Sequence, residues 1–171
     1  MAQIEILQAD ITRLDVDAIV NAANRHLTPG GGVCGAIHAA AGPRLAEECA
    51  GLGDCETGNA KLTQGYDLPA RYVIHAVGPI WRGGNENEVD LLASAYRNSI
   101  RLADENELHS IAFPAISCGI YGYPIEAASA IAIDATLAAM RESEHVERAV
   151  FACFGQDIEA ALRQAAAHHS L

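Results

Sequence analysis

The sequence predicts an α/β sandwich in which helices cover both faces of a β-sheet. The main observation is alternation, because short apolar runs typical of buried strands are separated by longer Ala-, Leu- and Glu-rich stretches typical of helices. The second is size, since a chain of 171 residues can bury about 70% of its extended surface in one core. Half of the residues are hydrophobic and 19% are charged, as in folded globular proteins. We therefore expect a single domain spanning residues 1–171.

The first half of the chain alternates strand and helix around one glycine-rich segment. Residues 3–8 and 18–20 are short apolar runs that predict strands, and the second runs into Asn-Ala-Ala-Asn at 21–24. Residues 28–35, Thr-Pro-Gly-Gly-Gly-Val-Cys-Gly, predict a loop. The elements expected next are Ala-rich helices at 36–41 and 43–51 and a strand at 60–65.

The second half repeats the alternation and adds a second loop. Residues 72–77 are apolar almost throughout, which predicts a central strand. Residues 87–106 have Leu and Ala at helical spacing, with acidic residues near the start, where the helix dipole favours them. Residues 111–116 predict a short strand cut by proline. The remaining elements expected are the loop Ser-Cys-Gly-Ile-Tyr-Gly-Tyr-Pro at 117–124, a helix at 126–141, a strand at 149–154 and an amphipathic helix at 158–169.

Charge and composition disfavour several classes of function. The net charge of −11 repels phosphate backbones, so general nucleic-acid binding and binding to anionic membranes are not expected. No apolar stretch reaches the roughly 20 residues that a membrane helix needs, and the first residues do not resemble a secretory signal. The five cysteines are odd in number and contain no CxxC pair, which disfavours a disulfide framework and a structural zinc site. We expect a cytoplasmic protein with reduced thiols.

Two glycine-rich loops, each between a strand and a helix, form the candidate ligand site. Ligand crevices in open α/β sheets lie beyond the carboxyl ends of the strands, and glycine lets backbone N–H groups approach a ligand closely. The helix after each loop offers unpaired N–H groups and a positive dipole end, which suit phosphate oxygens. Neither loop has the GxxxxGK[ST] or GxGxxG pattern in its required context, which disfavours ATP hydrolysis and a Rossmann site. Each loop taken alone also fits a plain tight turn.

Six ordered motifs resemble those of the MacroD-type macro domains. They are DIT at 10–12, VDAIVNAAN at 16–24, GGGVCGAIH at 30–38, AAG at 40–42, HAVGP at 75–79, and FPAIS at 113–117 followed by GYP at 122–124. Within that group the chain is most similar to the bacterial O-acetyl-ADP-ribose deacetylases, also through GDC at 53–55, WRGG at 81–84 and Asn85. The resemblance covers nearly the whole chain. It implies a three-layer αβα sandwich with a mixed central sheet, and ADP-ribose or O-acetyl-ADP-ribose as ligand, with ADP-ribosylated proteins as further partners.

The resemblance also assigns the residues that would hold the adenine. Asp10 would accept a hydrogen bond from the adenine amino group, with the backbone of Ile11 beside it, and Phe154 would lie against the ring. The residues themselves leave alternatives open. Asp10 also fits a cap of a helix or turn before Thr12, and Phe154 also fits a core position.

The two loops would hold the diphosphate and the distal ribose. By the resemblance Asn24 would hydrogen-bond that ribose, although an asparagine there also suits a left-handed turn. His38 lies one helical turn after Cys34, so the two side chains can share a face, although a lone His in an apolar helix is often a structural donor. Tyr121 also fits an exposed loop aromatic. The loop residues assigned to the diphosphate and distal ribose are Gly32, Val33, Gly35, Ser117, Gly119, Ile120 and Tyr121.

Cys34 departs from the family pattern, in which the loop reads GGGVDGAIH and the Asp is assigned to the water that attacks the ester at the distal ribose. A thiol is largely protonated at neutral pH and accepts hydrogen bonds weakly, so the usual general-base step is in doubt. Three interpretations stay open: slow hydrolysis aided by ligand phosphates and ordered water, binding without turnover, or a nucleophilic Cys34 with His38 as its base.

Slow hydrolysis is the preferred hypothesis, with O-acetyl-ADP-ribose or mono-ADP-ribosyl groups on acidic side chains as substrates. Its candidate catalytic residues are Asn24, Cys34 and His38. The runner-up is a non-catalytic reader of ADP-ribosylation. A zinc site made by Cys34, His38 and Cys118 is a less favoured alternative, since CxxxH is only a fragment of a zinc motif. The scheme needs neither metal nor cofactor.

Overall fold

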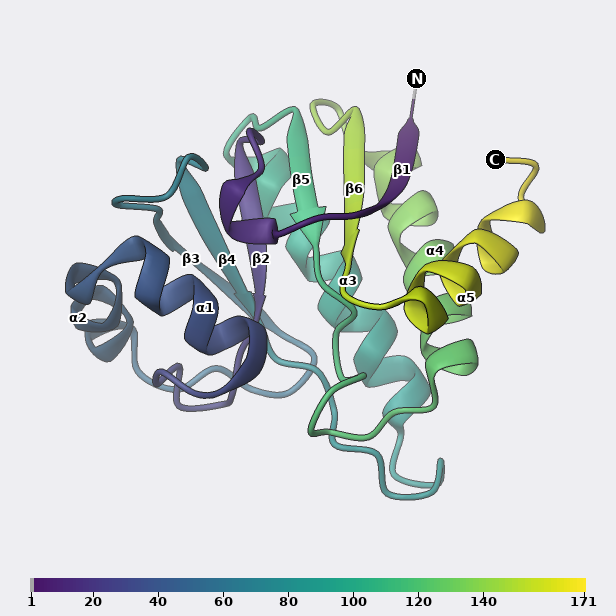
Figure 1. Cartoon of the computed structure of the whole chain (residues 1–171), viewed down its shortest axis with the longest axis horizontal. Coiled ribbons are helices and arrows are strands. Elements are labelled where there is room, and N and C mark those ends of the chain that lie inside the picture. The colour runs from purple at the N-terminus through teal and green to yellow at the C-terminus, as the bar shows by residue number, and fades with distance from the viewer. Residues whose placement is uncertain (1) are drawn as a thin grey trace.

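A six-stranded sheet with the order β1-β6-β5-β2-β4-β3 runs through the middle of the protein (Figure 1). The computed structural model describes residues 2–171. The strands are β1 (Gln3–Gln8), β2 (Ala18–Ala22), β3 (Ala60–Gln64), β4 (Tyr72–Ala76), β5 (Ser110–Phe113) and β6 (Arg148–Cys153). The helices are α1 (Gly32–Ala41), α2 (Pro43–Leu52), α3 (Glu88–Glu105), α4 (Ile125–Glu142) and α5 (Gln156–Ala167), with a 3-10 turn, η1 (Ile11–Arg13).

The sheet is mixed, as the resemblance implied. The five strands from β1 to β4 in this order run parallel to their neighbours, and β3, at the edge, runs antiparallel to β4. Parallel strands are usually covered on both faces and therefore apolar throughout. Strand β4 shows this, because every residue from Val73 to Ala76 is buried.

Two hydrophobic clusters on opposite faces of the sheet account for the three layers. Alternate side chains of a strand point to opposite faces, and in β4 Val73 belongs to one cluster and Ile74 to the other. The first cluster joins the sheet to η1, α1 and α2, and the second joins it to α3, α4 and α5. Figure 1 shows α1 and α2 in front of the sheet and α3 and α4 behind it. The predicted αβα sandwich is confirmed.

The predicted elements begin and end within two residues of the observed ones, except at two boundaries. Helix α1 begins at Gly32 rather than at residue 36, because the end of the glycine run forms the first helical turn instead of an open loop. Strand β5 ends at Phe113 rather than at residue 116. Pro114 has no N–H group to continue the ladder, so the strand stops before it.

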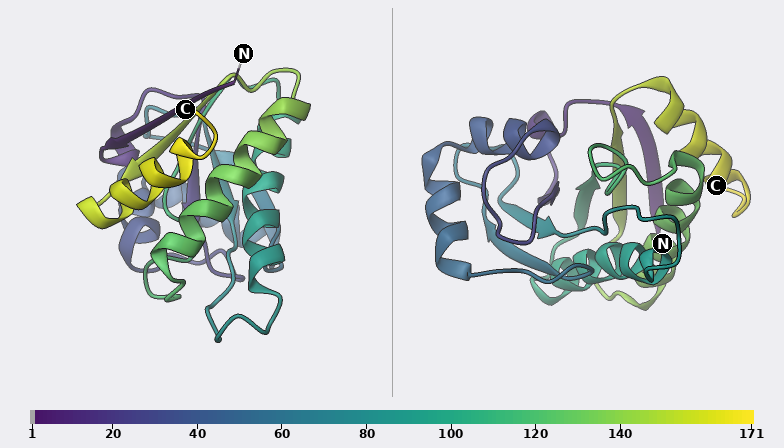
Figure 2. Two further views of the ribbon diagram at one scale, coloured as in Figure 1. Left: turned by 90° about the vertical axis from the view of Figure 1, so that its right-hand side faces the viewer. Right: turned by 90° about the horizontal axis from the view of Figure 1, so that it is seen from below.

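The carboxyl ends of the parallel strands point to one edge of the molecule, drawn at the bottom of Figure 1. The loops that leave these ends meet there, as the view from below in Figure 2 shows. No helix within residues 2–171 is long and apolar enough to cross a lipid bilayer.

Candidate ligand-binding site

A cavity of about 370 Å³ opens at the carboxyl ends of the parallel strands. Its volume is within the range of small-molecule sites, and its position is the one expected for an open α/β sheet. Both glycine-rich loops contribute to its wall. The residues that line it are Ile11, Ala22, Ala23, Asn24, Gly30, Gly31, Gly32, Val33, Cys34, Gly78, Pro114, Ala115, Ile116, Ser117, Cys118, Gly119, Ile120, Tyr121, Ala152, Phe154 and Ile158.

The first glycine loop places the start of α1 on the cavity wall. Gly32 has a φ of +58°, a conformation that glycine adopts without a steric penalty. The N–H of Gly35 donates to the carbonyl of Gly31, so the helical N–H groups before it have no partner in the helix. Gly35 itself is not part of the wall. A β-carbon at Gly35 would lie 2.5 Å from the carbonyl oxygen of Gly30, so this glycine is needed for close packing of the loop.

The second glycine loop, residues 114–124, forms the opposite wall. Ser117 is held in a left-handed conformation with φ of +68°, and its Oγ donates to the carbonyl of Pro79 at 2.7 Å. The N–H of Tyr123 donates to the carbonyl of Ser117, which closes the loop. The N–H groups of Gly119, Ile120 and Tyr121 donate to no acceptor within residues 2–171. They are therefore available to a ligand.

Asn24 lines the cavity and fixes the shape of its own loop. Its Oδ1 accepts hydrogen bonds from the N–H groups of His26 and Thr28, and its Nδ2 donates to the carbonyl of Thr28 at 2.9 Å. The left-handed turn allowed by the sequence is found instead at Leu27, which has a φ of +57°. Asn24 is thus a loop-forming residue whose amide lies at the cavity.

Cys34 lies on the wall as a buried thiol, with 6% of its surface exposed. Its Sγ accepts from Nδ2 of Asn21 at 3.6 Å and donates to the carbonyl of Thr28 at 3.7 Å. Both contacts suit a neutral thiol, because one is donated to the sulfur and the other by it. Within residues 2–171, the nucleophile interpretation finds no histidine in hydrogen-bond contact with this sulfur.

A buried polar chain extends from Cys34 into the core. Nδ2 of Asn21 also lies 3.1 Å from Nδ1 of His75, and Nε2 of His75 lies 2.9 Å from Oγ1 of Thr63. Burial lowers the pKa of His75 to about 3, and the nearby His38 adds to the shift, so the ring is neutral at ordinary pH. With Nδ1 accepting from Asn21, the proton lies on Nε2. This chain fixes the amide that contacts Cys34.

His38 does not line the cavity. Its ring centroid lies 6.4 Å from that of His75, and burial lowers the pKa of His38 below its ordinary value. Cys34 and His38 were expected to share a face of the helix. In the structure only Cys34 lines the cavity.

The structure bears on the alternatives left open for Asp10 and Phe154. The cap at Asp10 is found, and the core position for Phe154 is not. The carboxylate of Asp10 caps η1, accepting from the N–H of Thr12 at 3.0 Å and from its hydroxyl at 2.7 Å. These hydrogen bonds lower the pKa of Asp10, which lies next to the wall residue Ile11. The core alternative for Phe154 is wrong: 66% of this residue is exposed, and it lines the cavity.

Several wall residues were not predicted, and most of them are small residues at strand ends. Ala22, Ala23 and Ala152 are among them, and none carries a side chain larger than a methyl group. Gly78, just beyond β4, has no room for a side chain, because a β-carbon there would lie 2.3 Å from Oγ of Ser117. Small residues directly after apolar strand runs were the available signal. Cys118 also lines the wall, and burial raises the pKa of its thiol to about 11, which keeps it protonated.

The cavity wall carries no Asp, Glu, Lys, Arg or His side chain in the part of the chain that the structure describes. The polar groups that it offers are backbone amides, hydroxyls, thiols and the amide of Asn24. Within residues 2–171 there is also no group of three His, Cys, Asp or Glu side chains arranged to hold a metal ion. An anionic ligand would therefore be bound by backbone dipoles and not by charged side chains.

Comparison with known proteins shows the family. The family model described as Macro domain matches residues 20–132. The chain belongs to the macro domain family. This macro domain is 58% identical to a macro domain-containing protein of Chlorobaculum tepidum over 151 residues, which cover 88% of each chain.

Solved macrodomains show the same fold. The Oceanobacillus iheyensis macrodomain with ADP is 38% identical, with a TM-score of 0.93 over 98% of this chain and 91% of that one. The Trypanosoma brucei macrodomain in complex with ADP-ribose is 43% identical, with a TM-score of 0.89 over 96% of this chain and 69% of that one.

Proposed function

We propose that this macro domain binds ADP-ribose in the cavity. The proposal depends on one observation above all: an uncharged, mainly apolar wall lies between two loops that offer unpaired backbone N–H groups. Such groups bind a diphosphate even in a protein with a net charge of −11, because they act locally. The structures of the O. iheyensis and T. brucei macrodomains, which hold ADP and ADP-ribose, support it.

The arrangement of the wall suggests the orientation of the ligand. Adenine would lie at Ile11 and Phe154, where an exposed aromatic ring is available for stacking and the carboxylate of Asp10 lies beside the wall. The diphosphate would lie between the start of α1 and the N–H groups of residues 119–121. The distal ribose would then lie near Asn24 and Cys34.

A charge placed on the cavity rim tests this proposal. Ile120 is 93% exposed, so Ile120→Glu should fold normally while setting a carboxylate against the diphosphate. Titration calorimetry with ADP-ribose should show binding to the wild type and a Kd raised at least about ten-fold in Ile120→Glu. Val89→Glu is the matched control, because Val89 is an exposed residue of α3 outside the cavity wall. A wild type that neither releases heat nor gains thermal stability with millimolar ADP-ribose would overturn the proposal.

Slow hydrolysis of an ester at the distal ribose is the second function that we propose. We also propose that the chain is most similar to the O-acetyl-ADP-ribose deacetylases, which agrees with this function. The position of Cys34 is compatible with it, since the thiol lies on the wall near Asn24, where the distal ribose is proposed to bind, and is held by contacts with Asn21 and Thr28. Ligand phosphates and ordered water would position the attacking water. Within residues 2–171 the wall has no carboxylate or imidazole to act as general base, so we expect a low rate. Without turnover, the same site serves as a reader of ADP-ribosylation.

Substitution of Cys34 separates the enzyme from the reader. We expect Cys34→Asp to raise the turnover of O-acetyl-ADP-ribose by about 100-fold, because Asn21 would donate to a carboxylate able to accept a proton from water. Cys34→Ala should retain the slow rate and the wild-type Kd for ADP-ribose. Turnover in Cys34→Asp but none in the wild type would leave only the reader function. Loss of activity in Cys34→Ala would instead support a nucleophilic thiol.

A further inference from the structure

Glu88 is a buried carboxylate outside the cavity wall, and the proposed binding of ADP-ribose does not use it. It is the first residue of α3, and only 1% of its surface is exposed. Within residues 2–171 no Lys, Arg or His forms an ion pair with it. Burial of an unpaired carboxylate is costly unless hydrogen bonds replace its hydration. Its partners should therefore explain its presence.

The partners of Glu88 are backbone N–H groups of the segment before it, residues 79–87, which we call the Trp81 loop. Oε2 of Glu88 accepts from the N–H groups of Arg82 at 2.8 Å and Gly84 at 2.9 Å, and Oε1 accepts from that of Glu86 at 2.6 Å. Burial alone would raise the pKa of Glu88, but these hydrogen bonds outweigh it and lower the pKa to about 2. The carboxylate thus gathers an exposed loop around one buried point.

The Trp81 loop in turn contacts the second glycine loop through hydrogen bonds and ring packing. The N–H of Trp81 donates to the carbonyl of Tyr121 at 2.8 Å, and Pro79 accepts from Oγ of Ser117 at 2.7 Å. The Trp81 ring also packs on Tyr123, with ring centroids 4.7 Å apart. Figure 2, viewed from below, shows the two loops running side by side at the cavity end of the sheet.

The backbone between Glu88 and the cavity leaves little freedom for adjustment. Gly84 has a φ of +95° and packs so closely on the Trp81 indole that a β-carbon there would lie 3.1 Å from Cη2. At the far end of the chain of contacts, Ser117 and Tyr121 line the cavity. Movement of the Trp81 loop would therefore displace the backbone that holds the open N–H groups of residues 119–121.

We propose that Glu88 is a positioning residue, which holds the second glycine loop in its ligand-binding shape through the Trp81 loop. The role rests on the proposed binding of ADP-ribose, because the open N–H groups of that loop are the groups assigned to the diphosphate. Glu88 does not touch the ligand. It acts through two contacts, Trp81 with Tyr121 and Pro79 with Ser117.

The experiment compares Glu88→Gln with Glu86→Gln by titration calorimetry with ADP-ribose. The two variants lose the same charge from the same segment, but the Glu86 side chain is exposed and only its backbone N–H meets Glu88. A glutamine at position 88 turns an N–H₂ group toward backbone donors, so we expect the Kd to rise about ten-fold. Glu86→Gln should stay within about two-fold of the wild type.

Two further measurements distinguish positioning from a general loss of stability. Trp81 is the only tryptophan of the chain, so its fluorescence reports directly on the Trp81 loop, and its emission should shift to the red in Glu88→Gln alone. Ile133→Val creates a small defect in the core cluster of α3 and α4, outside both loops, and should lower the melting temperature without changing the Kd.

Gly84→Ala keeps the test open if Glu88→Gln does not fold. Gly84 is exposed, and its positive φ resists a side chain, so this variant disturbs the Trp81 loop without altering a buried group. Its Kd should also rise several-fold. Wild-type binding with an unchanged Kd in a variant whose Trp81 emission has shifted would overturn the positioning role alone. No binding by the wild type would overturn the proposed function, and the positioning role with it.

Discussion

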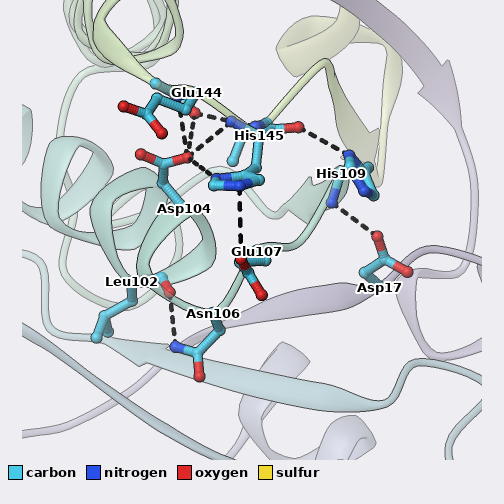
Figure 3. A network of polar contacts seen from close by, with 10 residues as sticks. Asp17, Leu102, Asp104, Asn106, Glu107, His109, Glu144 and His145 are labelled. Atoms are coloured by element: carbon cyan, nitrogen blue, oxygen red, sulfur yellow. Dashed lines mark hydrogen bonds and ion pairs between the residues drawn. The ribbon is translucent and has the colours of Figure 1, made fainter.

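At the amino ends of β2, β5 and β6, carboxylates of the protein accept hydrogen bonds from loop amides. At the carboxyl ends the glycine loops instead face a cavity whose wall, within residues 2–171, carries no charged side chain. Asp104 accepts from the N–H groups of Glu144 and His145, from the His145 ring and from Oγ of Ser143 (Figure 3). Asp17 accepts from the N–H of His109 in the same region.

The two ends of the sheet differ in what accepts from the backbone N–H groups of their loops. A loop becomes rigid when its backbone N–H groups donate to carboxylate oxygens of the protein. When the N–H groups have no acceptor in the protein, the loop can bind an anion. Glu88 links the two arrangements. Its carboxylate accepts from N–H groups of the Trp81 loop, and that loop in turn contacts the glycine loop whose N–H groups at 119–121 have no acceptor within residues 2–171. Changes at the two ends of the sheet should therefore have separable effects on stability and on ligand binding.

Among the substitutions, Gly35→Ala should have the largest combined effect on stability and binding. The new β-carbon would lie 2.5 Å from the carbonyl oxygen of Gly30, and a backbone atom cannot move aside cheaply. We expect the free energy of unfolding to fall by about 1–3 kcal/mol and ADP-ribose binding to be lost. Chemical denaturation and calorimetry measure the two effects. Gly51→Ala is the control, since its β-carbon would meet nothing within 4 Å and should be neutral or slightly stabilising. Unchanged binding in Gly35→Ala would contradict the close packing of the first loop.

Acid should destabilise the cavity side and the opposite end of the sheet in different pH ranges. The folded pKa of His75 is about 3, below its ordinary value of 6.5, so the unfolded chain binds a proton first as the pH falls. Stability should therefore decrease from about pH 6.5 toward pH 3, by at most about 1.4 kcal/mol per pH unit.

The amino-end carboxylates should respond at lower pH. Burial opposes ionisation of Asp17 and Asp104, but hydrogen bonds from backbone and side-chain donors prevail and lower both pKa values below 3.8. Their contribution is complete above pH 3.8 and is lost as the pH falls through the folded pKa values. Melting curves from pH 7 to pH 2 should show both phases, and His75→Gln should flatten only the first. A single phase below pH 3.8 would argue against a neutral buried His75.

Asp104→Asn should weaken the amino end and leave the cavity unchanged. Asparagine keeps one acceptor oxygen but loses the negative charge that strengthens the hydrogen bonds from Ser143, Glu144 and His145, and we expect a loss of about 2 kcal/mol in the free energy of unfolding. The Kd for ADP-ribose should not change. Glu105→Gln, at the exposed end of the same helix, loses only a 3.8 Å pair with Arg101 and should cost less than about 0.5 kcal/mol. A changed Kd in Asp104→Asn would show that the two ends are coupled.

Phe154→Ala should have the smallest effect on stability. The residue is 66% exposed, so its removal should change the free energy of unfolding by less than about 0.5 kcal/mol. Because the variant loses the proposed stacking against adenine, its Kd for ADP-ribose should be about ten-fold higher. ADP-ribose lacking the adenine base would bind the two proteins equally. Equal Kd values for ADP-ribose itself would place the adenine elsewhere.

Local sequence patterns were enough to predict the elements and the loops that line the candidate site. Hydrophobic periodicity and glycine clusters are local properties of the chain, and they located the strands, the helices and both loops within a few residues. Most of the loop residues predicted to meet the ligand, from Gly32 to Tyr121, do line the cavity.

Long-range packing set which side chains reach the cavity and which polar groups stay unpaired within residues 2–171. Gly35 became part of a helix, His38 turned toward His75, and Phe154 remained outside the core. Glu88, whose sequence position suggested only a favourable charge at a helix start, became the centre of the Trp81 loop. These outcomes depend on contacts between residues far apart in the chain or on the path of a loop, and no local pattern encodes either of them.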